Sequence, residues 1–264
     1  MTALTAQIEG IGILGPGFDD WPGAVALLTG AAIAVVQPTV VPALDLLPPA
    51  ERRRAALIVR LALSTGMQAA RMAARDPAVL ASVFASSGGD GPNCHEICTV
   101  LASADRQLSP TRFHNAVHNA AAGYWSIATG AKTPSNALSA HDSSFAAGLL
   151  EALVQLATNQ RPVLLIAYDA PYPQPLHAER PIADAFAVAL VLAPVVQGFA
   201  HAHLSVTLGE EPAGRLADVR LEALRRSIPA ARSLPLLRLL ARREQGRVVL
   251  DYLDGQSVAV VVTP

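Results

Sequence analysis

The sequence is poor in charged residues, and lysine is almost missing from it. Charged side chains make up 16% of the 264 residues, and Lys132 is the single lysine, so arginine supplies nearly all of the positive charge. The formal net charge is −1, which gives no reason to expect nucleic-acid binding. No basic segment followed by an apolar one opens the chain, so we see no export signal. These absences favour a cytoplasmic protein.

Cysteine is equally scarce. The chain has two, Cys94 and Cys98, with His95 between them. A structural zinc site usually takes four ligands, often from two paired clusters, and no second cluster is present. The pattern favours two reduced thiols on a helix face in a reducing cytoplasm. We therefore expect neither a metal nor a cofactor.

Two long stretches, 21–44 and 185–208, contain no Asp, Glu, Lys or Arg. A membrane helix needs about 20 mostly apolar residues without strong interruptions. Prolines and glycines interrupt both stretches, for example Gly30 and Pro38 in the first and Pro194 and Gly198 in the second. We expect no integral membrane segment.

Apolar residues are abundant. They make up 52% of the chain, which indicates a large core with strands covered on both faces. Short apolar strands alternate with helical segments, which is typical of a layered α/β fold. The expected strands lie near residues 8–14, 80–86, 135–140, 161–168, 186–192, 201–208, 247–250 and 258–262, and one long helix is expected from Pro48 to about Arg75.

One segment, PSNALSAHDSSFAAGLLEAL (residues 134–153), predicts a strand that turns sharply into a helix with His141 at the turn. Small residues surround the turn, as they do where a nucleophile must be reached from several sides. Asp142 is expected to cap the helix that follows. His114 and His118, four residues apart, are expected on one helical face.

The order and spacing of several motifs carry a resemblance. They are Ser86-Ser-Gly-Gly-Asp90, Leu108-Ser-Pro110, His118-Asn119, Ser126-Ile127, the turn at His141 with Ser144-Phe-Ala-Ala-Gly148, and the segment from Val163 to Asp169. Together they resemble the β-ketoacyl synthase N-terminal domain of the thiolase superfamily, and within it the short ketosynthase-like proteins of aryl polyene pigment clusters. The resemblance covers roughly residues 8–194.

The resemblance implies a thiolase-like layered α-β-α-β-α fold. Residues 1–195 would form the ketosynthase-like N-terminal half, and residues 196–264 a reduced C-terminal half of the same globular unit. It also places His141 where the family has its cysteine nucleophile. The family's two later histidine motifs do not occur here; the later histidines are His177, His201 and His203.

These departures point to a non-condensing, chain-length-factor-like subunit. It would form a heterodimer with an active ketosynthase and work with an acyl carrier protein in polyene, polyketide or fatty-acid-like biosynthesis. Four residues are candidates to line the substrate tunnel or the subunit interface: Phe113, His118, Trp125 and Phe145. Core packing is the alternative for the three aromatic residues, and an ordinary helix face is the alternative for His118. Arginines at 52–54 and between 215 and 247 are either solvated helix faces or a docking surface for the acidic carrier.

A second class of function stays open. The chain would then be an independent acyltransferase or hydrolase that uses His141 or Ser143. A serine hydrolase of the common kind needs Gly-x-Ser-x-Gly around its serine, and that pattern is absent.

Overall fold

The strands of the chain join into one mixed sheet in the computed structural model, which describes residues 3–32, 37–43, 45–196 and 200–264. The sheet has eight strands in the order β3-β2-β4-β5-β1-β6-β8-β7. In chain order they are β1 (Leu4–Leu14), β2 (Ala81–Ala85), β3 (Ser135–Leu138), β4 (Val163–Asp169), β5 (Phe186–Ala193), β6 (Ala202–Gly209), β7 (Gly246–Asp251) and β8 (Ser257–Thr263). β3, β2 and β4 are parallel, and every later pairing is antiparallel.

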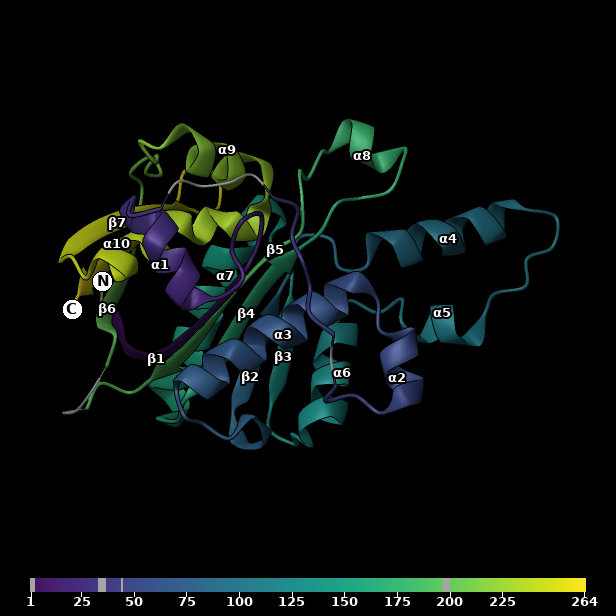
Figure 1. Ribbon diagram of the computed structural model, residues 1–264, viewed down its shortest axis with the longest axis horizontal. Coiled ribbons are helices and arrows are strands. Elements are labelled where there is room, and N and C mark those ends of the chain that lie inside the picture. Colours follow the sequence, from purple (N-terminus) through teal and green to yellow (C-terminus); the bar gives the residue numbers. More distant parts are fainter. Residues whose placement is uncertain (1–2, 33–36, 44, 197–199) are drawn as a thin grey trace.

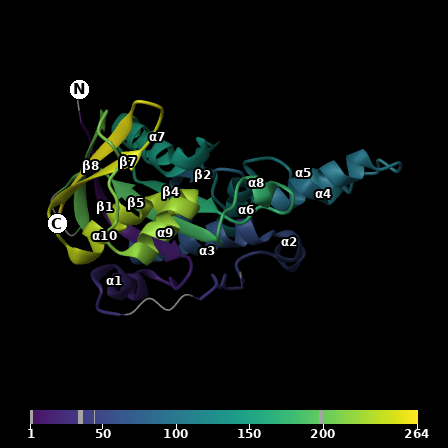
Figure 2. The same ribbon diagram turned by 90° about the horizontal axis from the view of Figure 1, so that it is seen from above.

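Helices cover both faces of this sheet (Figures 1 and 2). The described α-helices are α1 (Trp21–Thr29), α2 (Pro49–Arg54), α3 (Leu57–Met72), α4 (Gly91–Ala102), α5 (Pro110–His114), α6 (Ala120–Thr129), α7 (Ser144–Asn159), α8 (Leu176–Glu179), α9 (Val219–Ser227) and α10 (Leu234–Arg242). Short 3₁₀ turns lie at η1 (Pro77–Val79), η2 (His141–Ser143) and η3 (Pro229–Ser233).

Two cores result, one on each face of the sheet. α3 and α6 pack with one face of β4 and β5, and α7, α10 and η3 share a second core with the opposite face and with β6 and β8. Every residue of β4 and β5 is buried, as expected for strands covered on both sides. The expected α/β class is thus confirmed.

The sheet runs without a break across the expected boundary at residues 195 and 196, because β1 pairs with β5 on one edge and with β6 on the other. The apolar core beside α7 draws side chains from both sides of that boundary. The division into a complete and a reduced half stays a prediction.

Two local expectations were wrong. The helix expected from Pro48 to Arg75 is two helices, because Ala55 and Ala56 take extended backbone angles between α2 and α3. His114 and His118 do not share a helical face, since α5 ends at His114 and α6 begins only at Ala120.

The two stretches without charged residues do not form long helices in the parts that the structure describes. The first contains α1, with residues 33–36 and 44 outside the described residues, and the second contains β5 and most of β6, with residues 197–199 outside them. Across the described ranges, no helix is long and apolar enough to cross a bilayer.

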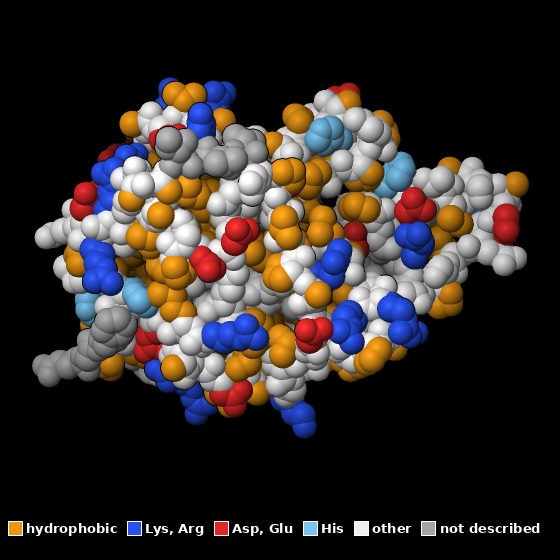
Figure 3. Space-filling model, in the orientation of Figure 1, with side chains coloured by type: hydrophobic (Ala, Val, Ile, Leu, Met, Phe, Trp, Pro, Cys, Tyr) orange, Lys and Arg blue, Asp and Glu red, His pale blue; other side chains and the backbone are white. Residues whose placement is uncertain are grey.

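An arm formed by residues 91–119 projects from the body of the molecule and carries α4 and α5 (Figures 1 and 2). Asn93 is the one buried residue of α4, and α5 has none. Three large apolar side chains stay exposed on the arm, at Leu101, Phe113 and Val117, and hydrophobic surface is visible there in Figure 3. The arm is therefore poorly covered by its own chain.

Candidate functional site

The turn between β3 and α7 holds His141 in an unusual backbone conformation. Its φ is 51°, in the left-handed region that costs a residue with a Cβ about 1–2 kcal/mol. The Ser144 hydroxyl fastens the turn: it accepts a hydrogen bond from the Ala140 N–H at 3.0 Å and donates one to the His141 carbonyl at 2.7 Å. The imidazole is 71% exposed, so the turn presents it outward.

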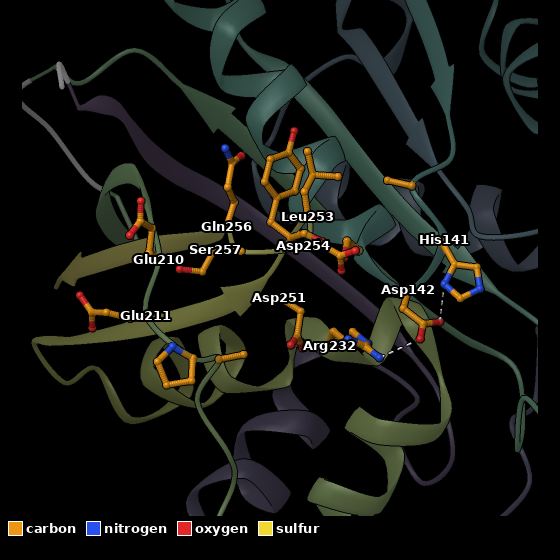
Figure 4. Close-up of a pocket in the computed structure, with 16 residues that line it drawn as sticks. His141, Asp142, Glu210, Glu211, Arg232, Asp251, Leu253, Asp254, Gln256 and Ser257 are labelled. Carbon is orange, nitrogen blue, oxygen red and sulfur yellow. Dashed lines mark hydrogen bonds and ion pairs between the residues drawn. The ribbon is translucent and has the colours of Figure 1, made fainter.

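His141 lies at the rim of a cavity of about 600 Å³ (Figure 4). The wall opposite comes from residues 210–213, which follow β6, from the end of β7, from the loop between β7 and β8, and from the start of β8. Acidic residues are the largest group in its polar lining, which comprises His141, Asp142, Ser143, Glu210, Glu211, Arg232, Asp251, Asp254, Gln256 and Ser257. Within the described part of the chain, His141 is the one histidine among the lining residues.

Asp142 does not cap α7, contrary to expectation. Its carboxylate is held by two arginines, Arg180 at 2.6 Å and Arg232 at 2.9 Å, and it lies between His141 and Arg232 in Figure 4. Arg232 also contacts Asp251 at 2.9 Å. Ion pairs with residues distant in the sequence have thus replaced the local cap, and they tie the turn to η3 and β7.

Sequence reasoning missed both arginines. Arg180 follows α8, and its second contact is a 2.7 Å hydrogen bond to the Ser87 hydroxyl. Arg232 was one of many arginines in the segment 215–247, and nothing in its spacing distinguished it. The convergence of the two on Asp142 arises from tertiary structure, so no local pattern signals it.

A buried carboxylate lies beneath this network at the end of β4. Asp169 is 2% exposed and accepts hydrogen bonds from the Ser87 N–H at 2.8 Å, the Ala230 N–H at 2.9 Å and the Ser86 hydroxyl at 3.3 Å. Burial raises the pKa of Asp169 to about 7, although these donors and Arg180 act in the opposite direction. An acidic residue directly after an apolar strand was the available signal for this group.

His118 lies close to the turn. Its Nε2 is 3.1 Å from the carbonyl oxygen of Leu138, three residues before His141. Its ring also sits over Gly89, where a Cβ would lie 3.2 Å from Nδ1. The structure thus brings His118 and His141 to the same end of β3.

The other three candidates lie elsewhere. Trp125 is 1% exposed in the core beside α3, edge-to-face with Phe84, and Phe145 is 1% exposed in the core beside α7. Phe113 is 67% exposed on the arm. Core packing accounts for Trp125 and Phe145, and a role for any of the three in a tunnel or an interface stays a prediction.

The remaining polar candidates are less suited to chemistry. Ser143 is 8% exposed, and its hydroxyl donates to the carbonyl of Tyr252. Cys94 and Cys98 are exposed free thiols on α4. The described residues contain no group of three or more His, Cys, Asp or Glu that would hold a metal ion.

The mixed sheet covered by helices on both faces, with a strained turn at the start of a buried helix, defines a ketosynthase-like protein. The family model for the beta-ketoacyl synthase N-terminal domain matches residues 29–247. The chain belongs to that family. No curated protein sequence gives a significant match.

Solved structures agree with this assignment. The chain is similar to one chain of the ketosynthase (ApeO) in complex with its chain length factor (ApeC) from Xenorhabdus doucetiae, with 26% identity, a TM-score of 0.74 and coverage of 98% of this chain and 99% of that one. The ishigamide ketosynthase/chain length factor gives 14% identity, a TM-score of 0.73 and coverage of 98% and 99%. A beta-ketoacyl synthase from Burkholderia phymatum gives 11% identity and a TM-score of 0.69, with coverage of 100% of this chain and 99% of that one. The last two are evidence of a shared fold alone.

Proposed function

We propose that this chain is a non-condensing, chain-length-factor-like subunit that pairs with an active β-ketoacyl synthase. The observation that carries the proposal is the imidazole of His141 at the strained turn where the family resemblance places a cysteine. The pathway would be polyene, polyketide or fatty-acid-like biosynthesis, with an acyl carrier protein as the second partner. The similarity to one chain of a ketosynthase in complex with its chain length factor supports the pairing.

The chemistry of condensation explains why the side chain matters. A condensing enzyme needs a thiolate that attacks the carrier thioester, forms a new thioester and releases the carrier thiol. An imidazole can attack the same carbonyl, but acyl-imidazoles hydrolyse readily and hold a growing chain poorly. His141 is therefore unsuited to storing an acyl chain.

Decarboxylation needs further groups that this cavity lacks within the described residues. His177 lies on α8, and His201 and His203 lie at the start of β6; none of the three lines the cavity beside His141. A partner subunit would have to supply both the thiolate and the residues that activate the extender unit.

The arm offers a surface for that partner. Phe113 and Val117 are 67% and 55% exposed, and α4 buries little against its own chain. An apolar surface of this kind is typical of association between subunits. The proposed heterodimer would cover it.

Mass spectrometry distinguishes the proposal from an independent acyltransferase or hydrolase. The purified chain is incubated with carrier protein bearing an acyl thioester, alone and with an active ketosynthase from the same organism. We expect acylation of the ketosynthase only, together with a stable one-to-one complex on native mass spectrometry. Ser143 is a poor alternative nucleophile, because it is buried and bonded to Tyr252. An adduct or thioester hydrolysis by the chain alone, lost in His141→Ala, would sink the proposal.

A further inference from the structure

A second cavity lies beside α10, with a volume of about 420 Å³. It shares Pro212 with the cavity at His141 and no other lining residue. One stripe of α10 lines it, formed by Pro235, Arg238, Leu239 and Arg242, which are spaced at one helical turn. The other walls come from β7 and from the segment between β6 and α9.

Positive charge dominates this cavity. Its lining includes Arg215, Arg238, Arg242 and Arg247, against one acidic residue, Glu244. These guanidinium groups come from three separate segments of the chain. Arg238 is half-buried, whereas Arg215, Arg242 and Arg247 are exposed to solvent around it.

Arg238 is the best evidence that the cavity takes a ligand. It is half-buried, and among the described residues it forms neither a hydrogen bond nor an ion pair. A cation partly withdrawn from water without a counter-ion is unfavourable. It also lies four residues from Arg242 on the same face of α10, and like charges at that spacing repel each other. An anion in the cavity would relieve both costs.

The nearby carboxylates leave much of this charge uncompensated. Arg242 reaches Glu244 only at 3.7 Å, beyond hydrogen-bond length. Arg215 interacts electrostatically with Glu222, but the Glu222 carboxylate already accepts two hydrogen bonds from Arg225 and one from the Leu216 N–H. Arg247 is the exception, because it is paired with Glu211 through both of its terminal nitrogens.

Apolar residues line the rest of the cavity, namely Leu216, Pro235, Leu239, Val248 and Val249. A ligand with charge alone would leave this surface unused. Arginine binds phosphate through two parallel hydrogen bonds, and its planar fork suits that geometry. The volume is in the range of sites for small organic molecules.

We propose that this cavity is a binding site for a phosphorylated small molecule with an apolar arm. The phosphate groups lie between Arg215, Arg238 and Arg242, and the arm packs on Leu239 and Val249. The site stands apart from the proposed partner role and does not depend on it.

Calorimetric titration of the full-length protein tests the site, with coenzyme A and inorganic pyrophosphate as probes. Coenzyme A carries a diphosphate and a flexible arm, whereas pyrophosphate has the charge without the arm. We expect coenzyme A to bind at least tenfold more tightly than pyrophosphate. Arg238→Gln and Arg215→Gln should each weaken its binding at least tenfold, and the exposed Arg161→Gln, which lies outside the cavity, should change it less than twofold.

Thermal unfolding with and without coenzyme A guards against misfolded variants. Each variant must melt within a few degrees of the parent protein in the absence of ligand, and the ligand should raise the melting temperature of the parent and of Arg161→Gln but not of Arg238→Gln. The proposal is overturned if coenzyme A does not bind at millimolar concentration, if it binds no more tightly than pyrophosphate, or if folded Arg238→Gln and Arg215→Gln bind it as the parent does.

Discussion

At the scale of single residues, His141 combines a costly backbone with an exposed side chain. Replacing it with glycine removes the left-handed strain and loses few contacts. The greater conformational freedom of glycine in the unfolded chain offsets part of the resulting stabilisation. We expect His141→Gly to raise the free energy of unfolding by about 1 kcal/mol relative to His141→Ala. Denaturant titration measures this.

Ala140→Gly is the matched control. Ala140 has a φ of −140°, so no left-handed strain is relieved there. It should lose about 0.5–1 kcal/mol of stability through the greater freedom of the unfolded chain. A His141→Gly protein no more stable than His141→Ala would show that the turn stores no strain.

Asp169 makes stability depend on pH. Burial raises its pKa to about 7, whereas in the unfolded chain it titrates near 3.9. The native state thus keeps a proton that the unfolded state releases. The stabilisation from this group is fully present below about pH 4 and is lost as the pH rises to about 7.

Asp169→Asn cannot titrate, so the comparison isolates this effect. Going from pH 5 to pH 8, the parent protein should lose about 2.6 kcal/mol of unfolding free energy relative to the variant. Above pH 8 the difference should be constant. Denaturant titrations of both proteins across this range measure it; a difference that does not change with pH would mean that Asp169 is ionised throughout.

At the scale of elements, α7 depends on a glycine for its approach to the sheet. A Cβ at Gly148 would lie 2.8 Å from the Ala85 Cβ and 2.9 Å from a methyl group of Leu165. Gly148→Ala should therefore destabilise the protein by about 1–3 kcal/mol through overpacking, despite the better helix propensity of alanine. Thermal and denaturant unfolding measure the change.

Gly123 in α6 is the matched control, because it is exposed and a Cβ there would meet nothing within 4 Å. Gly123→Ala should stabilise the protein by about 0.5–1 kcal/mol. If both substitutions stabilised, α7 would have room to move away from β2 and β4.

The elements show what the sequence was able to predict. Apolar runs bounded by turn residues predicted all eight described strands, because apolar runs and alternating apolar residues are local signatures of strands. The break between α2 and α3 escaped prediction, since alanines favour a helix and only packing decides that Ala55 and Ala56 are extended. The turn at His141 was predicted. The ion pairs of Asp142 with Arg180 and Arg232 were not, because the two arginines lie 38 and 90 residues from Asp142 in the sequence.

At the scale of the whole molecule, the arm of residues 91–119 is a part of the protein that its own chain covers poorly. It extends from the body (Figure 1). Its Phe113 side chain is 67% exposed, so the arm's own chain leaves it largely uncovered. If the proposed ketosynthase partner covers this side chain, Phe113→Glu would place a carboxylate in an apolar contact. We expect it to weaken the heterodimer at least tenfold, about 1.4 kcal/mol, and to leave the unfolding of the isolated chain unchanged within about 0.5 kcal/mol.

Val79→Glu provides the control for this last prediction. Val79 is 66% exposed, almost the same as Phe113, but it lies in η1 outside the arm. Its substitution adds the same charge to the surface and should leave the affinity for the ketosynthase unchanged. Biolayer interferometry on the purified subunits gives both dissociation constants. Equal affinities for the two variants would exclude the arm from the interface, while a loss specific to Phe113→Glu would place it there.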